Sequence, residues 1–218
     1  MEEEMILTED ITPTVIDNTH VFIGVKRKSD DGLFAMTEEE YQKIDKEEYA
    51  VDGIIIRNEE MEADLLYAPY EVDAVFGEGP EDIPETDKRR KNANPNPIFR
   101  DLDGEERTAW QLNYHHDTHE AGCAICEAVK FGWLPSGGEM NLVSQYLEDF
   151  NAKAELCGAE PVGENMYWLS TQYSEEYMWA MDMAKKTFEF WHSKATTMKV
   201  RPVKSASDYI ETVKEDVE

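Results

Sequence analysis

Five residues that can bind a metal or carry out thiol chemistry lie close together in the sequence: His115, His116, His119, Cys123 and Cys126. A Cys-x-x-Cys pair beside three imidazoles is typical of zinc sites. On one helix, however, only side chains three or four positions apart can reach the same ion. A tetrahedral structural site also takes its ligands from two separate elements, and Cys157 stands alone. We therefore expect small Cys side chains on the inner face of a helix, with no metal and no cofactor.

The sequence lacks the usual patterns of nucleophilic and nucleotide-dependent catalysis. The sequence contains no Gly-x-Ser-x-Gly turn, and its carboxylates are so frequent that paired ones occur by chance. The run Gly77-Glu78-Gly79-Pro80 precedes no helical pattern, so it does not form a phosphate-binding loop. We therefore predict that the protein is not an enzyme. A metal- or thiol-dependent enzyme that uses the His115 to Cys126 cluster remains an alternative.

Composition limits the class of protein. The 218 residues, 41% hydrophobic and 11% aromatic, suffice for one large domain or two small ones with a proper core. Lys and Arg number 21 against 48 Asp and Glu, and the net charge of −27 repels phosphate backbones and anionic lipids. We expect neither nucleic-acid nor membrane partners. The acidic start MEEEMILTED predicts no signal peptide, no apolar run is long enough for a transmembrane segment, and three Cys argue against a disulfide framework.

The first half of the chain predicts a small sheet. Residues 1–20 are expected to form an extended N-terminal arm, and strands are expected at 21–25, 53–57 and 63–67. Thr37 and Glu40 have the spacing of a capping box, which opens a short helix. A long loop insertion at about 77–104 is rich in Pro and contains the basic run Lys88 to Lys91. That run is a candidate for binding an anionic partner, although a solvated charge run is the simpler interpretation.

The second half predicts two helices and a β meander. One helix covers about 120–131, and a second begins at the capping box of Ser136 and Glu139 and ends at Gly158. Short strands are expected at 166–171, 177–183, 188–191 and 198–203, and residues 206–218 are expected to form an acidic tail. The predicted fold class is α+β, with two helices packed on small antiparallel sheets, and residues 21–205 form one domain.

An ordered set of motifs suggests a family. The motifs occur in this order: Gly132-Trp133-Leu134-Pro135-Ser136 with Glu139, Tyr167-Trp168-Leu169-Ser170-Thr171-Gln172-Tyr173, Trp179, and Val200-Arg201-Pro202-Val203. This pattern resembles the C-type-lectin-like C-terminal domain family of bacterial and phage surface proteins, which includes the end domain of the Legionella collagen-like protein. The family is similar in fold to formylglycine-generating enzymes and to the variable proteins of diversity-generating retroelements.

The resemblance implies roles for two sets of residues. The structural anchors, large or charged side chains expected between elements, are Trp133, Pro135, Glu139, Trp168, Trp179 and Arg201. The ligand-binding residues are expected on the outward face between the Tyr-Trp element and Arg201, where side chains can vary without disturbing the core. They are Tyr173, Ser174, Glu175, Tyr177, Trp191, His192 and Ser193.

The sequence departs from the family pattern in two places, and each departure argues against one activity known in the family. No Cys follows Cys157, which argues against formylglycine-generating chemistry, and Glu160-Pro161-Val162 lacks the amide ligand of calcium-dependent lectins. We therefore expect a non-catalytic ligand-binding or adhesive module that recognises a glycan or protein on a host surface. Because no secretory signal is expected, we place it in a phage virion, as a tail or head-decoration protein made in the host cytoplasm. Its N-terminal arm would contact other virion subunits. A purely structural virion or assembly protein is the other alternative.

Overall fold

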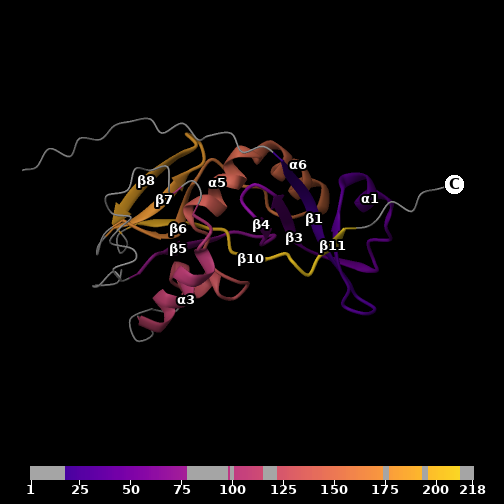
Figure 1. Cartoon of the computed structure of the whole chain (residues 1–218), viewed down its shortest axis with the longest axis horizontal. Helices are drawn as coiled ribbons and strands as arrows, with labels where there is room; N and C mark the ends of the chain where they lie inside the picture. The colour runs from indigo at the N-terminus through magenta and orange to yellow at the C-terminus, as the bar shows by residue number, and fades with distance from the viewer. Residues whose placement is uncertain are drawn as a thin grey trace, which may run out of the picture.

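The computed structural model describes residues 18–77, 98, 101–114, 122–173, 177–192 and 196–211. Two β-sheets lie at opposite ends of an elongated molecule (Figure 1). The six-stranded sheet has the order β10-β4-β3-β1-β2-β11. Its strands are β1 (Thr19–Arg27), β2 (Leu33–Met36), β3 (Tyr49–Asn58), β4 (Ala63–Tyr67), β10 (Val203–Ser205) and β11 (Ile210–Glu211).

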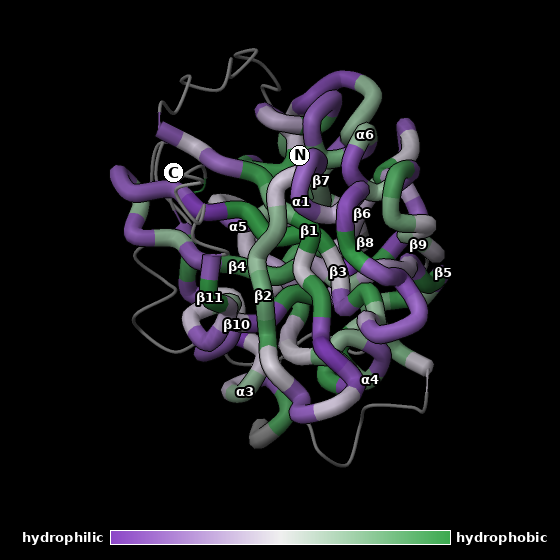
Figure 2. The backbone as a smooth tube through the Cα atoms, turned by 90° about the vertical axis from the view of Figure 1, so that its right-hand side faces the viewer, coloured by the Kyte–Doolittle hydropathy of each residue, from purple (hydrophilic) through white to green (hydrophobic). Residues whose placement is uncertain are grey.

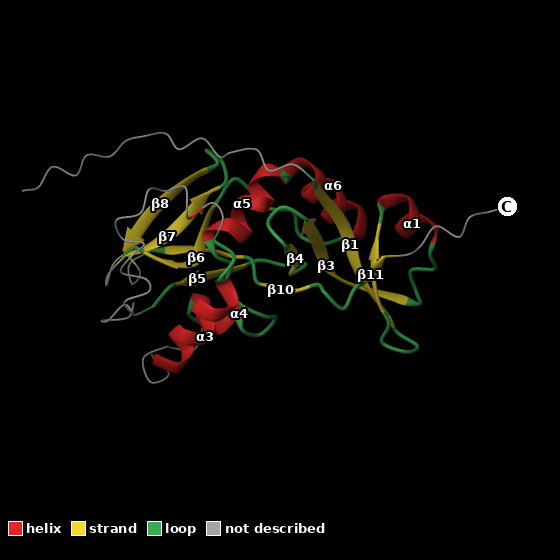
Figure 3. Ribbon diagram, viewed as in Figure 1, coloured by secondary structure: helices red, strands yellow, loops and turns green. Residues whose placement is uncertain are grey.

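The five-stranded sheet has the order β5-β9-β6-β7-β8. Its strands are β5 (Val72–Val75), β6 (Met166–Gln172), β7 (Tyr177–Asp182), β8 (Thr187–His192) and β9 (Thr197–Val200). The helices are α1 (Glu38–Lys43), α3 (Gly104–Tyr114), α4 (Ala124–Ala128), α5 (Gly137–Gln145) and α6 (Leu147–Cys157). Figure 3 shows α5 and α6 along one side of the molecule, and α3 with α4 below the five-stranded sheet.

The α+β class predicted from the sequence is confirmed, but two of its details are wrong. Five helices occur in the described ranges, and α1 is the short helix predicted at the Thr37 capping box. The number exceeds the two packed helices of the predicted fold because the helix after Ser136 bends at Tyr146 into α5 and α6, and because α3 was not predicted. Both sheets are mixed: β11 pairs parallel with β2, and β6 pairs parallel with β9. The parallel pairs arise from segments far apart in sequence, which short-range patterns do not predict.

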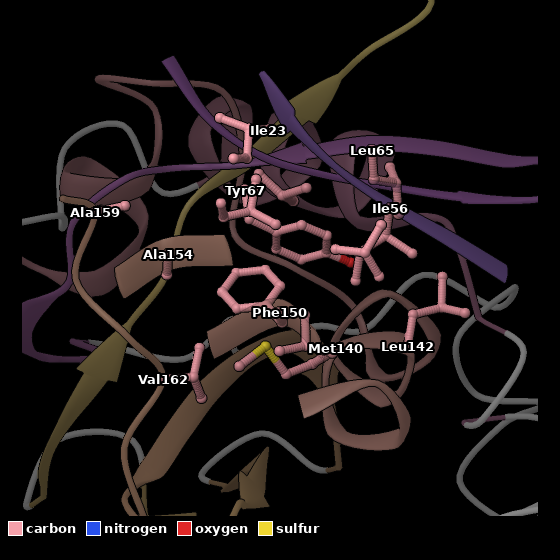
Figure 4. Close-up of a cluster of buried hydrophobic side chains, with 14 of the residues drawn as sticks. Ile23, Ile56, Leu65, Tyr67, Met140, Leu142, Phe150, Ala154, Ala159 and Val162 are labelled. Carbon is pink, nitrogen blue, oxygen red and sulfur yellow. The ribbon is translucent and has the colours of Figure 1, made fainter. Parts of the chain in front are cut away.

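The main core lies between the six-stranded sheet and α5 with α6. In Figure 4 the ring of Tyr67, from β4, lies beside the ring of Phe150, from α6, and their centroids are 5.8 Å apart in an edge-to-face arrangement. Strand residues such as Ile23 and Ile56 and helix residues such as Met140 close around them. Figure 2 shows hydrophobic residues gathered along the central strands and hydrophilic residues toward the rim.

A second core lies under the five-stranded sheet, on the face opposite to the one that α5 covers. There α4 contributes Ala124, Ile125 and Ala128, which pack with Phe76 and the fully buried Trp168. The five-stranded sheet is therefore covered on both faces, by α5 on one and by α4 on the other. This double cover explains why β6 is a nearly continuous run of buried residues rather than an alternating one.

The chain passes from one sheet to the other at Arg201 and Pro202. The sequence predicted one strand over 198–203, but β9 ends at Val200 in the five-stranded sheet and β10 begins at Val203 in the six-stranded sheet. Pro202 has no amide hydrogen for a strand ladder, which favours a break at this point. Its carbonyl accepts the Ala68 amide at 2.8 Å.

Two predicted segment boundaries differ from the structure. The acidic tail was expected from residue 206, yet Ala206 and Tyr209 are buried against the outer face of the six-stranded sheet, and β11 follows. The long insertion was expected to be exposed up to residue 104, yet Ile98 and Asp101 are buried. The N-terminal arm falls mostly at residues 1–17 and the basic run falls within 78–97, both outside the described residues.

Candidate ligand-binding surface

In the five-stranded sheet, the central strand β6 is followed by β7 and then by the edge strand β8. Adjacent strands pair antiparallel, with Trp179 opposite Phe190 and Tyr177 opposite His192. The register of β6 against β7 shifts between Trp168 and Gln172, an irregularity of the kind that often occurs beside binding sites. Beyond it, the Tyr173 amide donates to the Tyr177 carbonyl at 3.0 Å and joins the ends of the two strands.

Four aromatic rings gather on one face of these strands, and we call them the aromatic face: Tyr173, Tyr177, Trp179 and Phe190. Tyr173 stacks on Phe190 with a centroid distance of 4.3 Å and an interplanar angle of 7°. Trp179 meets both rings edge-on, at 5.3 Å from Tyr173 and 5.9 Å from Phe190, and Tyr177 meets Phe190 edge-on at 5.9 Å. Each residue is partly exposed.

Strand periodicity explains why these residues share a face. Successive side chains of a strand point to opposite faces, so Tyr177, Trp179 and Met181 lie on one side of β7 and Met178 and Ala180 on the other. The second pair is buried in the core beneath α4. Trp179 packs against the edge of the main core, so the aromatic face continues from that core toward solvent.

The start of α5 fixes the end of β6 that leads to Tyr173. The Ser170 amide donates to the Pro135 carbonyl at 2.8 Å, and the Gly137 amide donates to Thr171 Oγ1 at 3.2 Å. Thr171 Oγ1 in turn donates to Asp101 Oδ2 at 3.1 Å. The same Asp101 oxygen lies 3.1 Å from the Arg107 guanidinium, so a buried ion pair terminates this chain of contacts.

A buried carboxylate lies at the centre of this region. Glu139 has no exposed surface, and its Oε2 accepts the Ser136 amide at 2.8 Å while the Trp133 indole donates to both oxygens at 3.2 Å. Burial raises the pKa of Glu139 to about 7, against the lowering effect of these donors and with a further rise from Asp101. Because these donors join the first turn of α5 to the preceding Trp133 segment, we assign Glu139 a positioning role for α5.

The turn between β7 and β8 is closed by charges. Lys185 Nζ lies 2.7 Å from Glu189 Oε1 and 2.9 Å from Asp182 Oδ2. Hydrogen bonds to these two carboxylates, that of Glu189 first, raise the pKa of Lys185. The pairs lie at the far end of the hairpin from Tyr173, so they hold β7 against β8 without entering the aromatic face.

The structure separates the predicted ligand-binding residues. Tyr173 and Tyr177 lie on the aromatic face, whereas Trp191, 39% exposed, follows Phe190 in β8 and therefore lies on the opposite face. His192 ends β8, and Ser174, Glu175 and Ser193 lie outside the described residues. Phe190 was not among the predicted residues, because its place on this face follows from the strand register that pairs it with Trp179.

The predicted structural anchors differ in how completely they are buried. Trp168 is fully buried, and its indole donates to the Ala74 carbonyl at 3.0 Å. Arg201 is also fully buried and donates to the Ala68 and Glu160 carbonyls at 2.8 Å and to Glu71 Oε1 at 2.7 Å. The other anchors are the buried Pro135 and Glu139 and the half-buried Trp133 and Trp179. Trp179 therefore contributes to the candidate surface as well as to packing.

The metal-site hypothesis concerns residues that the structure describes only in part. His115, His116 and His119 lie outside the described ranges, while Cys123 and Cys126 begin α4. Within those ranges, no group of three or more His, Cys, Asp or Glu side chains is arranged to hold a metal ion. Among the same residues, no helix combines the length and the apolar composition needed to cross a membrane.

Comparisons with known proteins give one structural likeness. No family model matches the sequence, and no curated protein matches it. The fold is similar to that of a fimbrial protein from Bacteroides ovatus ATCC 8483, with a TM-score of 0.50 and 17% sequence identity. The alignment covers 64% of this chain and 35% of that one, so this chain matches only about a third of the fimbrial protein. At this identity the likeness concerns the fold.

Proposed function

We propose that the protein is a non-catalytic ligand-binding module with a C-type-lectin-like fold, and that it binds a glycan or protein on a host surface through the aromatic face. The observation that supports this proposal most directly is the aromatic face itself, a cluster of four partly exposed rings on a sheet whose two faces are otherwise covered. Aromatic rings provide large contact areas at low entropic cost, and they dominate binding energies at protein surfaces.

Two further observations support this proposal. Pre-organised rings lose little freedom on binding, and here each ring is held by at least one other ring. The protein of similar fold is described as a fimbrial protein, and this likeness favours a surface or adhesive role for this chain. We retain the specific form of this role, a phage tail or head-decoration protein, as the hypothesis to test. Detection of the protein in purified phage particles would support that location.

The test of the proposal is a binding screen with matched variants. The parent protein is applied to glycan arrays and to intact bacterial cells, and hits are measured with Tyr173→Ala and Tyr177→Ala. Loss of an aromatic anchor is expected to weaken binding by about 2 kcal/mol or more, roughly thirtyfold. Trp191→Ala is the control, because Trp191 is exposed on the same sheet but on its opposite face.

The outcomes separate the possible roles. Binding that depends on Tyr173 and Tyr177 and not on Trp191 supports the aromatic face as the site. Binding that depends on Trp191 alone places the site on the other face of β8 and contradicts the proposal. If no ligand is found and the protein instead self-associates or binds other virion subunits, the purely structural role is favoured. Thermal melting of each variant must match the parent, so that loss of binding is not loss of fold.

A further inference from the structure

Two cysteines face each other at the start of α4. Cys123 is the N-cap residue of this helix, and its Sγ accepts a hydrogen bond from the Cys126 amide at 3.3 Å. Cys126 is therefore the third residue of the helix, the position whose side chain reaches back toward the N-cap in a capping box. Here both reciprocal positions carry thiols, and neither cysteine is in a disulfide. Residues so placed in a first helical turn lie within the Cα separation of about 4.4–6.8 Å that disulfides span.

The two thiols differ in access. Cys123 is 2% exposed and belongs to the core beneath the five-stranded sheet, whereas Cys126 is partly exposed. Burial and the neighbouring Cys126 thiol raise the pKa of Cys123. An oxidant in solution is therefore expected to react with Cys126 first, because the Cys126 sulfur is the one that it can reach.

The third cysteine is separate from this pair. Cys157 ends α6, and its thiol donates to the Ala154 carbonyl at 3.5 Å. It packs against the main core, which is a different cluster from the one that contains Cys123. Within the described residues, the pairing of Cys123 with Cys126 is therefore the one that the fold brings together.

We propose that Cys123 and Cys126 form a reversible intramolecular disulfide by exchange with a small-molecule disulfide such as oxidised glutathione. This site is independent of the proposed binding function. The Cys126 thiol loses its proton to solvent, and the thiolate attacks one sulfur of the small disulfide and releases one thiolate. Cys123 then loses its proton, and its sulfur attacks Cys126 Sγ and releases the second thiolate. The protein loses two electrons and two protons, and the small disulfide becomes two thiols.

The fold gives this disulfide a structural consequence. Ala124 and Ile125, the two residues between the cysteines, are fully buried against the sheet. A cross-link across the first turn of α4 holds those residues in their packed positions. Because the folded chain keeps the two thiols adjacent and the unfolded chain does not, the folded state should favour the disulfide, and by linkage the disulfide should stabilise the fold.

The experiment is a glutathione redox titration of the full chain with Cys157→Ala, followed by acid quenching and mass spectrometry of the peptide that contains both cysteines. The folded protein is compared with the same protein in urea. We expect loss of two hydrogens from this peptide and an equilibrium constant for oxidation that is about tenfold or more larger in the folded protein. An equal or smaller constant in the folded protein would overturn the proposal.

Single-cysteine variants test the order of the steps. In Cys123→Ala, Cys126 should retain one glutathionyl group, because no second thiol is present to release it. In Cys126→Ala, Cys123 should remain unmodified in the folded protein. If Cys126 retains its glutathionyl group when Cys123 is present, the two sulfurs do not approach each other and the proposal is wrong.

Discussion

The buried Glu139 carboxyl makes the stability of the protein depend on pH in a direction opposite to that of most carboxylates. Burial raises the pKa of this carboxyl to about 7 in the folded protein, from an ordinary value of 4.5. Between pH 4.5 and pH 7, the folded state therefore keeps a proton on Glu139 that the unfolded state has released. The contribution of Glu139 to the free energy of unfolding is complete below pH 4.5, falls as the pH rises, and is lost above about pH 7.

The magnitude follows from the difference in pKa. A difference of about 2.5 units corresponds to about 3 kcal/mol at 1.36 kcal/mol per unit. Glu139→Gln removes the titration and nearly preserves the shape. The free energy of unfolding of the parent, minus that of this variant, should therefore fall by about 3 kcal/mol between pH 4.5 and pH 7. All other carboxylates occur in both proteins, so their contributions cancel in this difference.

Urea denaturation followed by tryptophan fluorescence at a series of pH values measures this difference. Trp133→Phe provides a second perturbation, because it removes the indole donor to both Glu139 oxygens and keeps the carboxyl. The pKa of Glu139 should then rise further, and the fall in stability should move to higher pH. A difference between parent and Glu139→Gln that stays constant over this range would refute the reasoning, because it would mean that the folded and unfolded states bind this proton equally.

Three further predictions concern stability, measured by urea or thermal unfolding. Trp168→Ala should cost about 3–5 kcal/mol, because it leaves a cavity in a closed core; an unchanged melting temperature would contradict the assignment of this ring to the interior. Arg201→Met should cost about 3–5 kcal/mol because it leaves the buried Glu71 carboxylate without its cation, and the double variant with Glu71→Gln should recover part of the loss. Gly53→Ala should prevent normal folding or shift the pairing of β3 with β4, since an added Cβ would lie 2.0 Å from the Tyr67 carbonyl oxygen. A Gly53→Ala protein with parental stability would show that these strands separate easily.

Local sequence patterns predicted many of the elements correctly. Thr37 with Glu40 marked the start of α1, and Gly158, with φ of 77°, ends α6 at the predicted residue. The hairpin of β7 and β8 also lies where alternating residues indicated it. These features depend on contacts between residues a few positions apart, and such contacts are visible in a single sequence.

The candidate surface was predictable only in part. Tyr173 and Tyr177 were identified from the resemblance and from residue type, but Trp191 was grouped with them although it lies on the other face of β8. Phe190, the ring on which Tyr173 stacks, was left out. Choosing between two adjacent aromatic residues requires the register of the strand, and a shift of one residue reverses the face of every side chain.

The sequence by itself determined the α+β class, the absence of recognisable catalytic motifs, the acidic charge, and the capped ends of the helices, because composition and short spacings encode them. Only the tertiary structure decided that β9 and β10 belong to different sheets, that residues 206–211 pack on the six-stranded sheet, and that four rings meet on one face. These features join residues far apart in sequence. Their positions depend on which surfaces the whole chain can bury together, and no local pattern contains that information.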